Sequence, residues 1–465
     1  MSTTSFTALE LNPSLLANLE SMGYSTMTPI QAQSLPAILR GDDLIAQAET
    51  GSGKTAAFGI GLLTRLTPSD FTVQALVLCP TRELADQVSK EIRRLASAIP
   101  NVKLLTLCGG LPTRPQVTSL EHGAHVIVGT PGRVLKHLRK GSLNLERLKT
   151  LVLDEADRML DMGFYDDIAE IVALTPLSRQ TLLFSATYPT AIQEISAAMQ
   201  ENPLRVSVTA THTPSNITQL FYEVASHAKR FAALIALLGH HQPVSSVIFC
   251  NTKQQCQEIA TLLHAKGFSA LALHGDLEQR DRDQVLVRFA NKSCSILVAT
   301  DVAARGLDIK ELEAVINYEL SFDPEVHIHR IGRTGRAGKS GLALTLFTPA
   351  EAVRVNAIEA YQRNPITLAA IDTLPVNPAL DLNAPMRQPL MVTLCIEGGR
   401  KNKLRPGDIL GALTSDDVLT GAHVGKIDLF DHHAYVAIER SLVDRALEQL
   451  TAKKMKGRFF KAWRL

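Results

Sequence analysis

One stretch of the chain combines glycines, a lysine and a threonine at the spacing of a phosphate-binding loop. It consists of Ala48, Glu49, Thr50, Gly51, Ser52, Gly53, Lys54 and Thr55. The glycines let backbone N–H groups turn toward an anion, the lysine can reach the β- and γ-phosphates, and the threonine hydroxyl can bind Mg²⁺. A coincidental glycine-rich turn is the alternative. The apolar strand-like run before the loop and the helical pattern after it favour nucleotide binding.

Two adjacent carboxylates stand where such a protein would hydrolyse the nucleotide. Asp154 follows the apolar run 150–153, and a carboxylate at the end of a strand is where nucleotide-binding proteins hold Mg²⁺. Glu155 is then placed to orient and deprotonate an attacking water. Adjacent residues on an extended segment point apart, so two different roles suit this pair. We predict hydrolysis that depends on Lys54 and both carboxylates, with Mg²⁺ held by Thr55 and Asp154.

A dense group of arginines lies among glycines much later in the chain. Arg333 and Arg336 are three residues apart, which places them on the same side of a helical turn. A solvated basic surface is one explanation. The other is neutralisation of a transferring phosphate, for which a finger arginine is worth roughly 10³–10⁵ in rate. Gly332 and Gly335 favour the second explanation, because they indicate close backbone approach.

The elements that must position these residues alternate between short apolar runs and helical patterns. Between about 43 and 208 the runs have the length and hydrophobicity of strands in a parallel sheet that is covered on both faces. Their polar ends should line one edge of the sheet, where ligands bind in such folds. A second alternation continues to about 348 without a phosphate loop. The sequence therefore predicts two α/β domains in tandem.

The composition is typical of a soluble globular protein. The chain has 465 residues, of which 45% are hydrophobic and 20% charged, so two or three domains are expected. The six cysteines are scattered without metal-ligand spacing, which is typical of reduced core residues in a cytoplasmic protein. The N-terminal region carries Glu10 and no long apolar run, so we expect no signal peptide, and no apolar run in the sequence reaches membrane-spanning length. We therefore expect a cytoplasmic protein that does not associate with membranes.

The C-terminal region is small and basic. Residues 388–465 contain 13 Lys and Arg against 9 Asp and Glu. The last fourteen residues hold six basic residues, no acid, and the aromatic residues Phe459, Phe460 and Trp463. Basic residues interleaved with aromatics are typical of nucleic-acid binding, although a solvated tail with a few core aromatics is the alternative. The expected domains are 1–208, 217–370 and, after a proline-rich linker at 371–387, 388–465.

Together, these motifs resemble the DEAD-box family of ATP-dependent RNA helicases over about residues 6 to 350. The resemblance is carried by the phosphate loop, Asp154-Glu155-Ala156-Asp157, Ser185-Ala186-Thr187, Gly23-Tyr24, Thr28-Pro29-Ile30-Gln31, Pro80-Thr81-Arg82-Glu83-Leu84, Gly109-Gly110, Thr130-Pro131-Gly132-Arg133, His274-Gly275-Asp276, and the runs Thr300 to Asp308 and His329 to Arg336. The departures, Met27 and Leu320 where proline is common, touch no assigned role. The implied fold class is α/β: two tandem RecA-like parallel-sheet domains of the P-loop NTPase type, followed by a small α+β domain.

The resemblance also implies roles for individual residues. ATP would be bound by Phe6, Gln31, Ala48, Glu49, Thr50, Gly51, Ser52, Gly53, Lys54, Thr55, Gly306 and Asp308. Hydrolysis would depend on Lys54, Asp154, Glu155, Arg333 and Arg336. The ATP and RNA sites would be coupled by Ser185, Thr187 and His329. The RNA backbone would contact Arg82, Gly110, Thr130, Arg133, Gln279, Arg282 and Thr300.

The C-terminal region resembles that of the bacterial DbpA subgroup, in which an RRM-like domain targets large-subunit ribosomal RNA. Its pattern is compatible with a βαββαβ order whose last strand spans 458–465. The run 433–436 overlays the middle of the RNA-binding consensus of RRM domains, but Asp431 stands where that consensus has a basic residue, and the first strand has no aromatic. Because this platform is weak, we expect recognition to depend more on Arg400, Lys401, Lys403, Lys453, Lys454, Lys456 and Arg458.

The function expected from this resemblance is local, ATP-dependent unwinding of large-subunit ribosomal RNA in precursor ribosomal particles during ribosome assembly. The two RecA-like domains would close on ATP and RNA, bend one strand and reopen after hydrolysis. We expect the enzyme to act as a monomer. An ATP-locked RNA clamp that assembles partners with little unwinding would keep the same motifs, and a DNA translocase is a third, weaker alternative.

Overall fold

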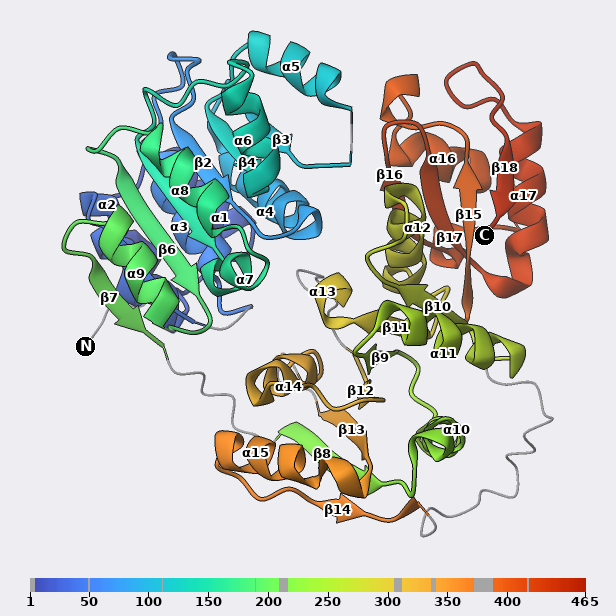
Figure 1. Ribbon diagram of the computed structural model, residues 1–465. Helices are drawn as coiled ribbons and strands as arrows, with labels where there is room; N and C mark the ends of the chain where they lie inside the picture. Colours follow the sequence, from blue (N-terminus) through green and yellow to red (C-terminus); the bar gives the residue numbers. More distant parts are fainter. Residues whose placement is uncertain are drawn as a thin grey trace. The chain divides into compact units, whose positions relative to one another are not determined.

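A computed structural model describes residues 5–48, 51–110, 112–188, 190–208, 216–304, 312–335, 340–371, 388–415 and 418–465 (Figure 1). The described residues form two compact units, one ending at residue 208 and the other beginning at residue 216. None of the helices in these ranges combines the length and hydrophobicity needed to cross a bilayer. The six cysteines are all buried free thiols, as expected for core residues.

The first unit is built on a sheet of seven parallel strands in the order β3-β4-β2-β5-β6-β1-β7. The strands are β1 (Leu44–Gln47), β2 (Ala75–Leu78), β3 (Leu104–Leu107), β4 (Val126–Gly129), β5 (Thr150–Asp154), β6 (Gln180–Ser185) and β7 (Leu204–Ser207). Successive side chains of a strand enter two different cores: Val77 packs on one face of the sheet, and Leu76 and Leu78 pack on the other. This double burial is why the central strands are continuous apolar runs.

Helices cover both faces of this sheet. One face is packed by α1 (Pro13–Ser21), α2 (Pro29–Arg40), α3 (Lys54–Thr64) and α4 (Arg82–Leu95). The other is packed by α6 (Pro131–Arg139), α7 (Ala156–Asp161), α8 (Tyr165–Ala173) and α9 (Thr190–Met199). Helix α5 (Thr113–Glu121) contributes the partly buried Leu120 to this core. The prediction of a parallel α/β domain is confirmed.

The second unit contains another seven-stranded parallel sheet, in the order β10-β11-β9-β12-β13-β8-β14. Its strands are β8 (Ile217–Glu223), β9 (Ser246–Cys250), β10 (Ala270–Leu273), β11 (Ile296–Thr300), β12 (Ala314–Asn317), β13 (Gly341–Phe347) and β14 (Leu368–Ala369). Its helices are α10 (Arg230–His241), α11 (Lys253–Ala265), α12 (Gln279–Ala290), α13 (Asp301–Ala304), α14 (Pro324–Ile331) and α15 (Ala352–Gln362). The predicted second α/β domain is therefore confirmed as well.

The same unit ends in a small antiparallel sheet of order β16-β17-β15-β18. Its elements are β15 (Met391–Ile396), α16 (Pro406–Leu413), β16 (Val424–Leu429), β17 (Ala434–Glu439), α17 (Val443–Ala452) and β18 (Ala462–Arg464). Leu394 and its partner Val436 face the two helices and form the core with them. The βαββαβ order agrees with the sequence, but the last strand is three residues long. Residues 455–458 form a tight turn that delays its start.

The other face of the small sheet packs against the end of α12. Tyr435 is only 2% exposed and lies with Cys395 against Val287. Beside them, the Asn291 side-chain amide donates to Thr393 Oγ1 at 2.9 Å. This contact combines apolar packing with a buried hydrogen bond, so it fixes the orientation of the small sheet on the helix.

A buried arginine joins the start of α10 to the segment before α15. Arg230 is 1% exposed and is paired with Glu351, with Glu319 3.8 Å away. Glu351 also accepts hydrogen bonds from the backbone N–H (2.8 Å) and the hydroxyl (2.9 Å) of Thr348. The carboxylate therefore pairs with a buried cation and also caps the N-terminus of the following helical segment.

We predict that Glu351→Ala destabilises the second unit by about 3–5 kcal/mol, because it leaves Arg230 buried without its main partner. Urea unfolding followed by circular dichroism measures the effect. Asn356→Ala, on the exposed face of α15, is the control and should leave the transition unchanged. The double variant Arg230→Met/Glu351→Met should be less destabilised than Glu351→Ala. Equal stability of Glu351→Ala and wild type would contradict the assignment.

Candidate nucleotide and RNA site

The phosphate loop connects β1 to α3. Gly53 has φ +98°, and a Cβ there would lie 2.6 Å from the side-chain nitrogen of Gln31, so the position requires glycine. Lys54 opens the helix, is only 6% exposed and donates from Nζ to the carbonyl of Ala48 at 2.8 Å. The ammonium therefore points back across the loop, where a bound phosphate would compete for it. Glu49 and Thr50, which the sequence also places in this loop, lie outside the described residues.

Gln31 links the first turn of α2 to the phosphate loop. Its amide nitrogen donates to the carbonyl of Gly53 at 3.1 Å, and its amide oxygen accepts from the backbone N–H of Thr28 at 2.9 Å. The predicted base-stacking residue Phe6 is packed in the core at 3% exposure, edge-on to Tyr24 at 6.1 Å between ring centroids. Gln31 therefore contacts the phosphate loop directly, and Phe6 belongs to the same hydrophobic core as the helix α3 that follows the loop. The contact of these two residues with adenine stays a prediction.

Asp154 ends β5 and Ser185 ends the neighbouring strand β6, which pairs with β1. The backbone N–H of Ala48 donates to the carbonyl of Ser185 at 3.0 Å, so the phosphate loop begins where β6 ends. Burial raises the pKa of Asp154 to about 7, and the Lys54 cation limits the rise. Asp154 Oδ1 has no hydrogen-bond partner among the described residues although it is buried. A buried, unpartnered carboxylate oxygen is suited to Mg²⁺, which takes oxygen ligands.

Glu155 adopts a conformation that few residues other than glycine adopt. Its φ is +55°, at the N-cap of α7, which costs roughly 1–2 kcal/mol. Arg158, one turn further on, holds the carboxylate by an ion pair of 3.0 Å in which both side chains are buried. Backbone strain of this kind clusters at functional sites. The arrangement fixes the carboxylate next to Asp154, as a general base requires.

Asp157 ties the loop after β5 to the loop after β6. One of its carboxylate oxygens accepts hydrogen bonds from the N–H groups of Ala186 (3.1 Å) and Thr187 (3.0 Å) and from the Thr187 hydroxyl (3.1 Å). The candidate site residues chosen from the sequence did not include Asp157, although its motif was recognised. The three contacts show that this carboxylate positions Thr187, one of the predicted coupling residues.

The residues predicted to contact RNA in the first unit lie together at the same edge of the sheet. The Arg82 guanidinium lies against Gly110, where a Cβ would collide with it, and Gly110 has φ +72°. Arg133 NH1 donates to Gln116 Oε1 at 2.6 Å. Burial lowers the pKa of Arg133, and the Arg82 cation lowers it further. Thr130 precedes Arg133 at the start of α6 and completes the group.

A buried histidine supports this arrangement and was not anticipated from the sequence. His137 Nε2 lies 2.9 Å from Gln116 Oε1, the atom that Arg133 contacts, and its Nδ1 lies 2.8 Å from Ser142 Oγ. Burial lowers the pKa of His137, and the Arg133 cation adds to the effect. Only the fold brings Gln116 and His137 together. His137 and Gln116 therefore act as positioning residues for the Arg133 side chain.

In the second unit, the predicted RNA contacts surround α12 and the end of β11. Gln279 opens α12 and donates to Asp283 at 2.8 Å, and Arg282 donates to the carbonyl of Ala303 at 2.8 Å. Thr300 ends β11 directly before α13. Arg282 thereby ties the helix that begins at Gln279 to the segment that follows Thr300.

The arginine motif begins in α14, which contains His329. Arg330, 2% exposed, binds Asp301 through Nε (2.6 Å) and NH2 (2.7 Å) and donates to the carbonyl of Glu319 at 2.7 Å. Arg333 follows the helix and is 6% exposed. Sequence reasoning did not assign Arg330, whose contacts anchor the motif to the sheet. The remaining predicted residues of this unit, Gly306, Asp308 and Arg336, lie outside the described residues.

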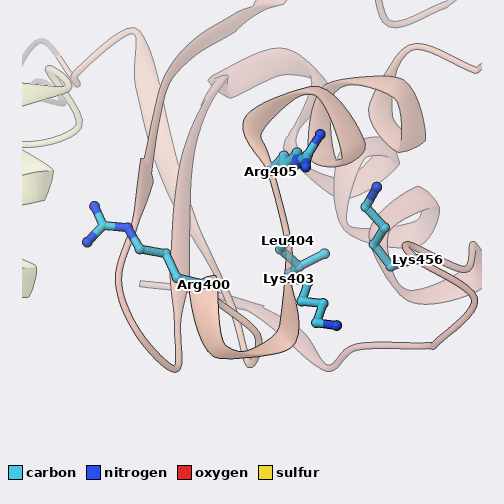
Figure 2. A pocket seen from close by; sticks show the side chains of 5 residues that line it. All are labelled: Arg400, Lys403, Leu404, Arg405 and Lys456. Atoms are coloured by element: carbon cyan, nitrogen blue, oxygen red, sulfur yellow. The ribbon is translucent and has the colours of Figure 1, made fainter. Parts of the chain in front are cut away.

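The C-terminal domain has a hollow of about 440 Å³ lined by Arg400, Lys403, Leu404, Arg405 and Lys456. Figure 2 shows Arg405 and Lys456 across the hollow from each other, with the Arg400 side chain extending outward. Three of its basic residues are among those predicted to bind RNA, and Arg405 is an addition. Lys401 lies in the same short turn as Arg400. Lys453 and Lys454 precede the tight turn that carries Lys456, and Arg458 ends it.

Comparisons with known proteins agree with these features. Residues 28–195 match the DEAD/DEAH box helicase family, residues 229–338 the helicase conserved C-terminal domain, and residues 393–464 the DbpA RNA binding domain. The chain is 56% identical to the ATP-dependent RNA helicase DbpA of Escherichia coli (strain K12), with 98% of each chain covered. It is 46% identical to the DEAD-box ATP-dependent RNA helicase CshA of Geobacillus kaustophilus, covering 77% of this chain and 76% of that protein.

A solved structure also resembles the chain. The structure of S. cerevisiae Dbp5 bound to RNA and ADP BeF3 has a TM-score of 0.72 and 33% identity, and the match covers 79% of this chain and 96% of that chain. The chain therefore shares the fold of that protein over most of its length.

We predict that Gly110→Ala weakens RNA binding by roughly tenfold, about 1.4 kcal/mol, because the added methyl group displaces Arg82. Gly141→Ala is a matched control: Gly141 also has a positive φ (+67°), but a Cβ there meets nothing within 4 Å. Both variants carry the backbone strain, and only Gly110→Ala moves the arginine. Fluorescence anisotropy with a labelled RNA oligonucleotide measures the affinities. Equal losses in the two variants would show that strain alone is responsible.

Proposed function

This chain belongs to the DEAD-box family of ATP-dependent RNA helicases and, within it, to the DbpA type, and from this membership we propose that it unwinds short structured segments of large-subunit ribosomal RNA during ribosome assembly. The observation that supports the substrate best is the C-terminal domain, which matches a DbpA RNA binding domain and carries a cationic hollow. Precursor ribosomal particles in the cytoplasm are the proposed partner, and the proposed acting form is a monomer.

In the proposed mechanism, the edge formed by β1, β5 and β6 binds ATP. Lys54 would exchange its bond to the Ala48 carbonyl for the β- and γ-phosphates. Mg²⁺ held by Thr55 and Asp154 would neutralise charge on the same phosphates. Glu155, fixed by its ion pair with Arg158, would accept a proton from the attacking water. Hydrolysis then needs little covalent help from the protein, since positioning and charge neutralisation provide most of the acceleration.

The arginines of the second unit would complete the charge neutralisation. Arg333 follows α14 directly, and Arg330 anchors that helix through Asp301. An arginine contributes to a phosphoryl transition state through its planar fork as well as its charge. We propose that Arg333 and Arg336 contact the γ-phosphate when the two RecA-like domains close. His329, Ser185 and Thr187 would report the nucleotide state to the RNA-contacting residues.

The proposed RNA contacts divide into two classes. In the motor, Arg82, Gly110, Thr130, Arg133, Gln279, Arg282 and Thr300 are of types that suit phosphate and sugar, which position RNA without reading its sequence. In the C-terminal domain, the basic residues around the hollow would choose the RNA. Sequence-specific RNA recognition usually targets unpaired bases in loops and at ends. We therefore assign the choice of substrate to the C-terminal domain.

For the hydrolytic step, we predict that Glu155→Gln keeps ATP and RNA binding and loses turnover by at least about 10²-fold, the lower range for general-base catalysis. The amide keeps the shape of the side chain but cannot accept the proton. Steady-state ATP hydrolysis with saturating RNA measures turnover, and anisotropy measures binding. Strand displacement by the wild type must require hydrolysable ATP. If the wild type holds RNA without displacing a strand, the protein is a clamp and the helicase proposal is wrong.

For substrate choice, we predict that Lys403→Glu/Arg405→Glu abolishes the preference for one large-subunit RNA fragment over others. The slope of log affinity against log salt should also fall by about two, one for each lost phosphate contact. Hydrolysis stimulated by saturating unstructured RNA should be unchanged, because the motor is intact. Arg445→Glu/Lys461→Glu makes the same charge change away from the hollow lining and is the control. A double variant that still discriminates among fragments would overturn the assignment.

A further inference from the structure

On the flat face of the small sheet, the Tyr435 position is not available to stack on bases in this structure. Tyr435, the aromatic residue of the matched consensus, is 2% exposed and packs with Cys395 against Val287 of α12. The Tyr435 ring also meets Phe430 edge-on, at 5.3 Å between centroids. An RNA-binding domain of this kind normally stacks bases on that face. Base stacking in this domain therefore needs an aromatic residue other than Tyr435.

A second aromatic residue is presented outward by the tight turn before β18. Met455 and Arg458 exchange backbone hydrogen bonds of 2.8 and 3.1 Å, and the two residues between them, Lys456 and Gly457, have φ of +51° and +76°. These values are those of a type I′ turn, which holds its ends in a fixed geometry. Phe459 directly follows this turn and is 60% exposed.

Buried residues on both sides anchor the turn. Met455 is 2% exposed and Phe460 is 8% exposed, and both belong to the core beneath the sheet. The Phe460 ring packs so closely on Gly398 that a Cβ there would collide with it. Because its next neighbour Phe460 is fixed in the core, the outward position of Phe459 is set by the fold. The Phe459 ring therefore stays in water and is free to contact a ligand.

The surroundings of Phe459 are cationic. Lys454 Nζ lies 5.4 Å from the centroid of the Phe459 ring. Lys456, in the same turn, lines the hollow together with Arg400, Lys403 and Arg405 (Figure 2). A positively charged groove beside an exposed aromatic ring is the combination that proteins use to bind single-stranded nucleic acid, where the cations follow the phosphates and the ring stacks on a base.

We propose that Phe459 stacks on an unpaired base of ribosomal RNA while the cations of the hollow hold the phosphates next to that base. The proposal rests on the proposed function, since it concerns the same RNA. The partner is an unpaired base because pairing and stacking within a helix hide the faces of the bases. Phe459 is thus a specificity-determining residue for loops or single-stranded ends over uninterrupted duplex.

The test uses the full chain and the large-subunit RNA fragment that it binds best, with 2-aminopurine placed at successive unpaired positions. Phe459→Ala should weaken binding by about 5- to 150-fold, the range for loss of one stacked base. Phe459→Trp should retain or strengthen binding, and Phe459→Leu should resemble the alanine variant, because leucine is apolar but has no π-face. The salt dependence of binding should be the same in all of these variants, since no cation is removed.

Two comparisons separate stacking from a structural effect. Leu390→Ala removes another exposed apolar side chain of the same domain, 69% exposed, and should leave the affinity unchanged. One 2-aminopurine position should lose fluorescence on binding the wild type and the tryptophan variant but not the alanine variant. If Phe459→Ala binds within twofold of wild type, or the leucine variant equals wild type, the proposal is wrong. If the wild type itself prefers no ribosomal fragment, the proposed function fails instead.

Discussion

In the first unit, every strand of the sheet runs in the same direction, and the site depends on this one constraint. Parallel strands end at a common edge, so the phosphate loop after β1, Asp154 at the end of β5 and Ser185 at the end of β6 become neighbours. The hydrogen bond from Ala48 to Ser185 is the direct expression of this geometry. Ala48 and Ser185 lie more than a hundred positions apart in sequence, and no local preference could bring them together. The candidate site can therefore form only because the strands that carry its residues run in the same direction.

The same edge is locally unfavourable to the folded state. Asp154 is buried without a full set of partners, Glu155 is held at positive φ, and the Glu155–Arg158 pair is removed from water. The apolar cores on the two faces of the sheet supply the stability that maintains this arrangement. In the proposed mechanism, the Asp154 carboxylate would gain a ligand when a metal–nucleotide complex binds.

The sequence was sufficient for elements with a strong local pattern and insufficient where tertiary contacts decide. The central strands were predicted because burial on both faces makes them continuous apolar runs. The edge strand β7 has only a weak pattern because three of its four residues are exposed, and β3 has a weak pattern because its two middle residues are only half-buried. Among site residues, the motif types could be identified, whereas the positioning roles of Asp157, Gln116 and Arg330 could not. Those roles exist only once loops from different strands meet. Strand β18 is short because Lys456 and Gly457 have positive φ values and form a turn before it. In the sequence, a glycine after a lysine is only a weak signal of such a turn.

The turn before β18 separates the residues that hold the domain together from those that face solvent. Met455 and Phe460 are fixed in the core, whereas Lys456 and Phe459 between them contribute little to it. Substitutions at the outward positions therefore carry a small cost in folding, and a chain can sample new side chains there without risking its scaffold. The arrangement resembles the relation between a framework and its variable loops in binding proteins. In evolutionary terms, related enzymes could acquire different RNA preferences through this short segment alone, and in practical terms it is the natural place to randomise when retargeting the motor to a new transcript.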